Sequence, residues 1–327
     1  MNDPVDDAQQ ATGVTAIECV LRIAIFLQAG GVAIQYLFDE FEVESSLFAV
    51  LLYEWEWSQA VAQRVDDLFF GCWLAAGTLI VLLPLAKSTF GPRTDPSSTS
   101  SGVWRAMRPL EWTLLAGLFT LQLIDTWATW HRGTGEQFNA LVFWERAARW
   151  SLPLVLALLL PRGSAALSAR RVQWAMWLAR LAVAITFVAH GVKALDADGD
   201  FVDYLIAASS RLGGWWPPES IVHLWLKIIG VVDLGVAVLI LLIRSRVVAL
   251  YMALWALIAA WSRVVHSGTA ADFEVIIRSG NYCLPLAVAL YFHYFRADVT
   301  TGSSEGPTTS EDTTTEIVDA AANANDE

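Results

Sequence analysis

Polar residues recur in short pairs in the second half of the chain, at spacings that place both members of a pair on one face of a helix. The spacings are three or four residues, about one helical turn. The pairs are His190 with Lys193, His223 with Lys227, Arg263 with His266, and Glu274 with Arg278. Basic residues outnumber acids in this set, which favours an anionic or quinone-like head group, or a phospholipid phosphate, as a ligand. Snorkelling of long basic side chains to a membrane surface would explain the same pattern without any ligand.

Two further charges, Arg180 and Asp233, lie inside long apolar segments. A charge within a bilayer costs about 2.5–3.5 kcal/mol on insertion scales, so each residue is expected to find a partner. Counted from the ends of their segments, both lie about 12 Å from the inner boundary on neighbouring antiparallel helices. We therefore predict an ion pair between Arg180 and Asp233. This pair would fix helix register or, alternatively, relay a proton or a substrate.

No familiar catalytic or metal-binding pattern accompanies these residues. The histidines lack the spacing of a zinc helix, no glycine-rich phosphate loop follows a strand, and no G-x-S-x-G motif occurs. The three cysteines, Cys19, Cys72 and Cys283, are too widely separated to suggest a redox pair or a disulfide framework. We assign no catalytic residue and no metal ligand.

The elements that carry these residues are expected to be membrane-spanning helices. Of the 327 residues, 55% are hydrophobic and only 17% are charged, whereas soluble domains average about 25% charged. This composition excludes a disordered protein, a nucleic-acid-binding protein and an ordinary cytosolic enzyme. Most of the net charge of −12 comes from acids in an N-terminal tail, residues 1–14, and in a disordered C-terminal tail, residues 297–327.

Apolar segments of about 20 residues, the length that crosses a bilayer, occur repeatedly between the tails. Six candidates are clear and two are weaker because their first halves are charged. The clear candidates are 15–37, 67–87, 110–130, 172–195, 221–243 and 247–266, and the weaker ones are 138–160 and 272–295. Two shorter amphipathic segments, 45–60 and 201–209, are expected to lie in the interface.

An internal repeat leads us to count both weaker segments as spans. The parallel segments are Leu123–Trp127 with Leu257–Trp261, His131–Thr134 with His266–Thr269, and Pro153–Leu158 with Pro285–Leu290. The repeat predicts an all-α, polytopic membrane protein of two tandem four-helix bundles, about eight spans, in 15–161 and 172–295. Basic loop residues concentrate on one side, which predicts a multi-pass protein of the cell (inner) membrane with both termini cytoplasmic.

The first bundle is expected to have diverged from the second. It lacks the polar cluster predicted for the outer ends of the second bundle. Its Asp125 is expected to pair with Arg146 or Arg149 across two spans. Any functional site is therefore assigned to the second bundle.

Residues 172–295 resemble the DoxX-like family of four-span membrane proteins. The resemblance rests on Arg180, on His190–Lys193 at the end of the first span, on Asp233–Gly235 in the second, and on Arg244–Arg246 before the third. Asp233 stands where a Glu is expected. The first half shares the resemblance only through the repeat. The resemblance implies a four-helix membrane bundle of a kind sometimes associated with quinone-linked redox assemblies.

Three functions fit this sequence. The first is an accessory or lipid- or small-ligand-binding membrane component without catalysis of its own. The alternatives are a membrane subunit of a quinone-linked redox system and a small-anion transporter. The bound molecule would be a quinone or a phospholipid, and the partners would be the lipid bilayer and another membrane protein, with no nucleic acid.

Overall fold

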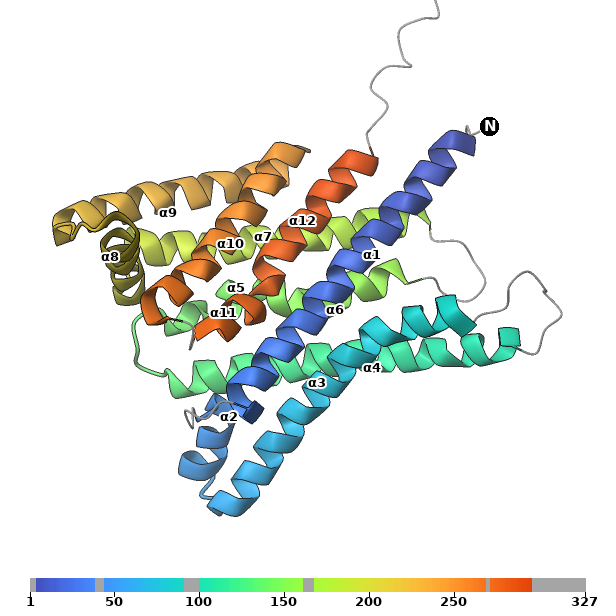
Figure 1. The fold of residues 1–327 in the computed structure, drawn as a ribbon, viewed down its shortest axis with the longest axis horizontal. Coiled ribbons are helices and arrows are strands. Elements are labelled where there is room, and N and C mark those ends of the chain that lie inside the picture. Colours follow the sequence, from blue (N-terminus) through green and yellow to red (C-terminus); the bar gives the residue numbers. More distant parts are fainter. Residues whose placement is uncertain (1–3, 39–43, 91–99, 161–167, 269–270, 296–327) are drawn as a thin grey trace, which may run out of the picture. The chain divides into compact units, whose positions relative to one another are not determined.

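The computed structural model describes residues 4–38, 44–90, 100–160, 168–268 and 271–295, and this part of the chain is helical with no strand (Figure 1). The first half contains α1 (Pro4–Ala33), η1 (Ile34–Phe38), α2 (Ser46–Ala49), η2 (Val50–Glu54), α3 (Gln59–Phe90), α4 (Ser100–Arg132), η3 (Asn139–Leu141), α5 (Val142–Glu145) and α6 (Ala147–Leu159). The second half contains α7 (Ala169–Leu195), α8 (Gly199–Gly213), α9 (Glu219–Leu242), α10 (Arg246–Ser267), α11 (Asp272–Ile277) and α12 (Ser279–Tyr294).

Six helical segments in the described residues are long and apolar enough to cross a membrane. They are Gln9–Leu37, Gln59–Ala86, Ala169–Leu195, Glu219–Leu242, Arg246–Ser267 and Asp272–Tyr294. The prediction of an all-helical, multi-pass membrane protein is therefore confirmed at this level. Segment 272–295, which looked weak in the sequence, is one of the six.

The two remaining predicted spans, 110–130 and 138–160, are not among the six. The first lies in α4, a helix of 33 residues whose apolar stretch is interrupted by polar side chains. Two of these, Gln122 and Thr126, are buried, with exposures of 3% and 2%. Polar side chains that make contacts inside the protein therefore lower the mean hydropathy of this helix. The second falls on short α5 and on α6, which has only 13 residues.

The N-terminal residues 4–14, predicted as a tail, instead form the first turns of α1. Packing against the end of α12 explains the difference. A Cβ added at Gly13 would lie 2.6 Å from Cβ of Tyr294, so the two helices approach closely there. The predicted C-terminal tail, 297–327, lies outside the described residues.

One continuous hydrophobic core joins the long helices of both halves. α1 packs against α3 of its own half and against α11 and α12 of the other half. α7 packs against α9 of its own half and against α5 and α6 of the other half. Figure 1 shows α1 beside α12 and α6 beside α7.

The closest approach of two long helices in the second half is between α7 and α9. A Cβ added at Gly230 would lie 2.7 Å from the carbonyl oxygen of Gly191, and one added at Gly191 would lie 3.1 Å from the carbonyl oxygen of Gly230. Small residues at such a contact let two backbones touch, as is typical of helix pairs in membranes. This contact fixes the register of α9 on α7.

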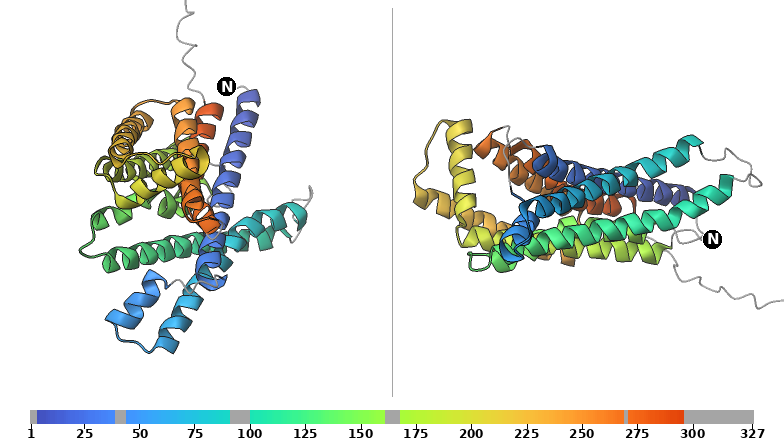
Figure 2. Two further views of the ribbon diagram at one scale, coloured as in Figure 1. Left: turned by 60° about the vertical axis from the view of Figure 1, so that its left-hand side comes forward. Right: turned by 90° about the horizontal axis from the view of Figure 1, so that it is seen from below.

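Short helices cross the ends of the long ones in each half. In the second half α8 lies across the ends of α7 and α9, and in the first half α2 and η2 stand between α1 and α3 in the chain (Figure 2). The segments predicted as short amphipathic helices, 45–60 and 201–209, therefore form short helical pieces.

Candidate functional site

A cavity of about 190 Å³ lies in the second half, between α7, α8, α9, α10 and the start of α12. Most of its wall is apolar or aromatic. The polar side chains that line it are Thr186, His190, Tyr204, Asp233, Ser262, Arg263, Arg278 and Asn281. A mainly apolar cavity with a few placed polar groups is the usual form of a small-molecule site.

The cover of the cavity is α8, whose sequence explains both its ends and its inner face. The Asp198 side chain accepts a hydrogen bond from the Asp200 amide at the start of the helix, and Gly214 ends it with a φ of 63°. Phe201, Tyr204, Leu205 and Ala208 line the cavity. Their spacing of three and four residues places them on one helical face, so α8 turns this face towards the cavity.

Three of the eight residues predicted as a ligand site line this cavity: His190, Arg263 and Arg278. The Nδ1 atom of His190 lies 2.8 Å from the carbonyl oxygen of Thr186. A carbonyl can only accept, so Nδ1 carries the proton, and in the neutral ring Nε2 is the unprotonated nitrogen. Arg263 donates from Nη1 to the carbonyl of Ala259 at 2.6 Å, and its guanidinium lies 4.8 Å from the centre of the Tyr204 ring.

Three more predicted residues surround the cavity without lining it. Lys193 lies between two carboxylates, 3.3 Å from Glu145 and 3.2 Å from Asp198. Glu274 forms an ion pair with Arg278, as its spacing suggested. His266 meets the Tyr204 ring edge-on, with ring centres 5.4 Å apart.

His223 and Lys227 are the two predicted residues that the structure does not bring to the cluster. His223 lies 3.4 Å from Glu219 on its own helix, and Lys227 is exposed. The buried face of α9 carries Leu226 and Asp233, and His223 and Lys227 fall on other faces. The pairwise spacing on α9 predicted a shared face correctly but could not show which way that face points.

The predicted ion pair between Arg180 and Asp233 is wrong. Arg180 donates instead to the carbonyls of Ile240 and Leu241, at 2.8 and 2.6 Å, and its guanidinium lies 4.0 Å from the Trp177 ring centre. A Cβ added at Gly191 would lie 3.3 Å from Cβ of Asp233, so Asp233 is level with Gly191. Gly191 is roughly 16 Å further along α7 than Arg180, at 1.5 Å per residue.

The physical reason for this error is the unequal extension of the two helices. The count of residues along each helix assumed that the first residue of α7 and the last residue of α9 lie at the same inner membrane boundary. In the structure α7 begins at Ala169, and Arg180, eleven residues later, is level with the last turn of α9. The carbonyls of that last turn have no partner further along the helix, so they accept from Arg180.

Asp233 is 4% exposed and faces the cavity, where Trp255 of α10 is its hydrogen-bond partner. Its Oδ1 atom has no hydrogen-bond partner among the residues that the structure describes. The same holds for Oδ1 of Asn281, which is 7% exposed, and for Nε of Arg263. Leaving a buried polar group unpaired costs about 1–3 kcal/mol. The wall of the cavity therefore offers hydrogen-bonding capacity that the protein does not use.

Two residues of the first half, Glu145 and Arg149, belong to the same polar cluster. Glu145 pairs with Lys193, and Arg149 lies within electrostatic range of Arg263 and Arg278. The assignment of the site to the second half alone is thus corrected. The signal in the sequence was the four-residue spacing of Glu145 and Arg149, which repeats that of Glu274 and Arg278.

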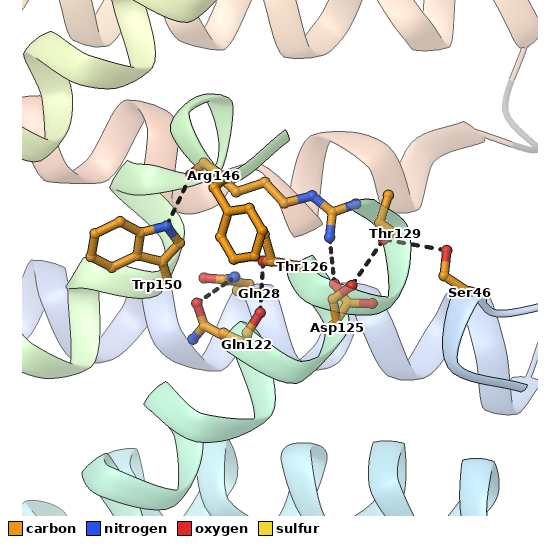
Figure 3. A network of polar contacts seen from close by, with 9 residues as sticks. Gln28, Ser46, Gln122, Asp125, Thr126, Thr129, Arg146 and Trp150 are labelled. Atoms are coloured by element: carbon orange, nitrogen blue, oxygen red, sulfur yellow. Dashed lines mark hydrogen bonds and ion pairs between the residues drawn. The ribbon is translucent and has the colours of Figure 1, made fainter. Parts of the chain in front are cut away.

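The first half has a polar network of its own, of which only the Asp125 ion pair was predicted from the sequence (Figure 3). Arg146 donates to Asp125 at 2.7 Å, which confirms the predicted partnership. Gln28 of α1 donates to Gln122 of α4 at 3.2 Å, and Thr129 lies 3.3 Å from Ser46. These contacts tie α1, α2, α4 and the chain between α5 and α6 together.

The polar side chains of the cavity wall are able to hold a ligand through hydrogen bonds. Within the described residues no group of three His, Cys, Asp or Glu side chains could hold a metal ion. The lining combines donors, in Arg263 and Arg278, with acceptors, in Asp233 and Asn281. In comparisons with family models, with curated proteins and with solved structures, no match to this chain was found.

Proposed function

We propose that this chain is an eight-span protein of the cell (inner) membrane, built from two tandem, DoxX-like four-helix bundles with both termini in the cytoplasm. The order of elements supports the duplication: each half has a long helix, a short helical piece, two long helices, a short helix and a final helix with an internal proline. The contacts between halves support it too. α1 meets α11 and α12 as α7 meets α5 and α6, which is the pattern of a two-fold axis relating parallel repeats.

The function that the geometry supports best is binding of a small amphiphilic ligand in the cavity under α8, without catalysis. One observation carries this proposal: buried polar atoms of Arg263, Asp233 and Asn281, all of them in the cavity wall, have no partner in the described part of the chain. A core that only needed stability would bury apolar groups there or pair the polar ones.

The size of the cavity limits the ligand. A cavity of about 150 Å³ in another protein holds one benzene molecule. A volume of about 190 Å³ therefore admits one substituted ring or a short chain. A diacyl phospholipid could place only part of its structure inside.

A quinone-linked role is the second candidate, because the volume of the cavity also suits a single quinone ring. The residues fit such a group: Arg263 could donate to a ring oxygen, and aromatic side chains of α7 and α8 could stack on the ring. A bound quinone would supply two-electron redox chemistry.

Mass spectrometry of the purified protein tests the proposal. The chain is extracted in mild detergent, and bound small molecules are identified and quantified for the native chain and for Ala256→Trp, which fills the cavity. Leu257→Trp is the matched control, since Leu257 lies beside Ala256, is 38% exposed and does not line the cavity.

We expect one small amphiphile per chain in the native protein and in the control, and less than about a tenth of that in Ala256→Trp. Equal amounts in all three proteins, or no bound molecule in any of them, would contradict the proposal. Identification of a quinone would select the second candidate.

A further inference from the structure

The cavity carries polar groups of opposite character at different depths. The guanidinium groups of Arg263 and Arg278 mark what we call its outer end. The carboxyl group of Asp233 marks what we call its inner end, because its partner Trp255 precedes Arg263 by two turns of α10. We propose that the site is built for a single-ring aromatic carboxylate that carries a hydrogen-bond donor, such as a hydroxyl, on the far side of the ring. This inference rests on the proposed function, because it names the class of ligand for the same cavity.

The outer end is suited to an anion. Arg278 is neutralised by Glu274, and Lys193 by Glu145 and Asp198. Arg263 has no carboxylate partner within the described residues, and its Nε atom has no acceptor. Arg149 adds a further positive charge nearby. A carboxylate is the planar anion that a guanidinium binds through two parallel hydrogen bonds.

The inner end is suited to a hydrogen-bond donor. Asp233 accepts from Trp255 and keeps Oδ1 unpaired. Within the described residues it forms no ion pair. A carboxyl oxygen facing an apolar cavity accepts a hydroxyl but opposes a second anion or an ether oxygen. The ligand must therefore present its anion outwards and its donor inwards.

The side walls favour a flat ring over a flexible chain. On α10 the lining residues are three alanines, Ala256, Ala259 and Ala260, together with the larger Trp255 and Ile258. Phe201 and Tyr204 of α8 and Phe187 of α7 line the cavity as well. Aromatic side chains in the wall of a cavity can stack on an aromatic ring.

The test measures binding of three probes to the full chain in detergent by isothermal titration calorimetry. The probes are 4-hydroxybenzoate, benzoate, which lacks the donor, and 4-methoxybenzoate, which replaces it with an ether. We expect 4-hydroxybenzoate to bind at least about tenfold more tightly than the other two, because only it pairs with Asp233.

Variants assign the two ends. Asp233→Leu should bind 4-hydroxybenzoate and benzoate equally, because the acceptor is gone while the anion site remains. Arg263→Gln should weaken all three probes at least about tenfold. Glu219→Gln changes an acid on the outer turn of α9 that does not line the cavity, and it should keep the native order of affinities.

Equal affinity for the three probes in the native chain overturns the inference. If no probe binds but a small amphiphile is still lost from Ala256→Trp, the inference fails while the proposed function stands. If no probe binds and no amphiphile co-purifies, both fail. If Asp233→Leu still prefers 4-hydroxybenzoate over benzoate, the inference is also overturned, because another group would then accept the hydrogen bond from the hydroxyl.

Discussion

The two halves of the molecule treat their buried polar residues differently. In the first half most polar groups between α1, α4 and α6 bind one another, as Arg146 does with Asp125, although Oε1 of Gln28 has no partner among the described residues (Figure 3). In the second half the groups between α7, α10 and α12 surround a cavity and leave atoms of Arg263, Asp233 and Asn281 unpaired. The comparison separates polar residues that hold helices together from polar residues available to a ligand.

The repeat that we propose offers a reason for the difference. It matches Leu123–Trp127 with Leu257–Trp261, and thus Asp125 with Ala259. At the same offset Gln122 matches Ala256, and Thr126 matches Ala260. Those three alanines line the cavity. The space filled by a polar network in the first half is left open in the second by side chains that stop at Cβ.

Two buried arginines show a similar contrast at the other ends of the helices. Arg22 donates to the carbonyl of Ile80 at 2.7 Å, as Arg180 does to that of Ile240. Arg22 also pairs with Glu111 at 2.5 Å, whereas the ring of Trp177 lies against Arg180. Both arginines therefore donate to a carbonyl of a neighbouring helix. Their positive charges are compensated differently, by a carboxylate for Arg22 and by an aromatic ring for Arg180.

Breaking the closed network should have the largest effect. Asp125→Ala leaves Arg146, whose side chain is only 20% exposed, without its carboxylate. We expect the free energy of unfolding to fall by about 3 kcal/mol. Chemical unfolding of the protein in detergent measures this change. Asp203→Ala removes an exposed acid of α8 and should change stability by less than about 0.5 kcal/mol. Similar losses in both variants would show that the network does not hold the first half together.

A smaller loss of stability is expected at the close contact between α7 and α9. Gly230→Ala places a Cβ 2.7 Å from the carbonyl oxygen of Gly191 and should cost about 2 kcal/mol of unfolding free energy. Gly235→Ala, on the same helix with no atom within 4 Å of the new Cβ, should be neutral or stabilise by up to about 1 kcal/mol. The same unfolding experiment compares them. A neutral Gly230→Ala would refute the register that turns Asp233 into the cavity.

Much of the fold could be predicted from hydropathy and spacing, because both are local properties of the chain. The apolar segments predicted the long helices, and four-residue spacing predicted the Glu274–Arg278 pair, which a single helix positions. The Asp125–Arg146 pair joins neighbouring elements and was also within reach.

Residue positions between helices were not predictable in the same way. The Arg180–Asp233 pairing failed because helix ends extend by unequal lengths, and a shift of three turns separates the two residues. Glu145 and Arg149 were missed at the site because their four-residue spacing shows only that they share a helix face, and not that this face packs against the other half. The cavity itself depends on three alanines, which in apolar sequence look like ordinary helix formers.

The smallest change tests the central claim most directly: Ala259→Asp gives the second half the carboxylate that the first half has in Asp125. Its measurement is the affinity of the co-purifying ligand for the native chain and the variant, with Lys227→Gln as an exposed control on α9. The account predicts that the new carboxylate pairs with Arg263, so that affinity falls at least about tenfold in Ala259→Asp and stays unchanged in the control. Unchanged affinity in Ala259→Asp would contradict it, because the ligand would then lie elsewhere.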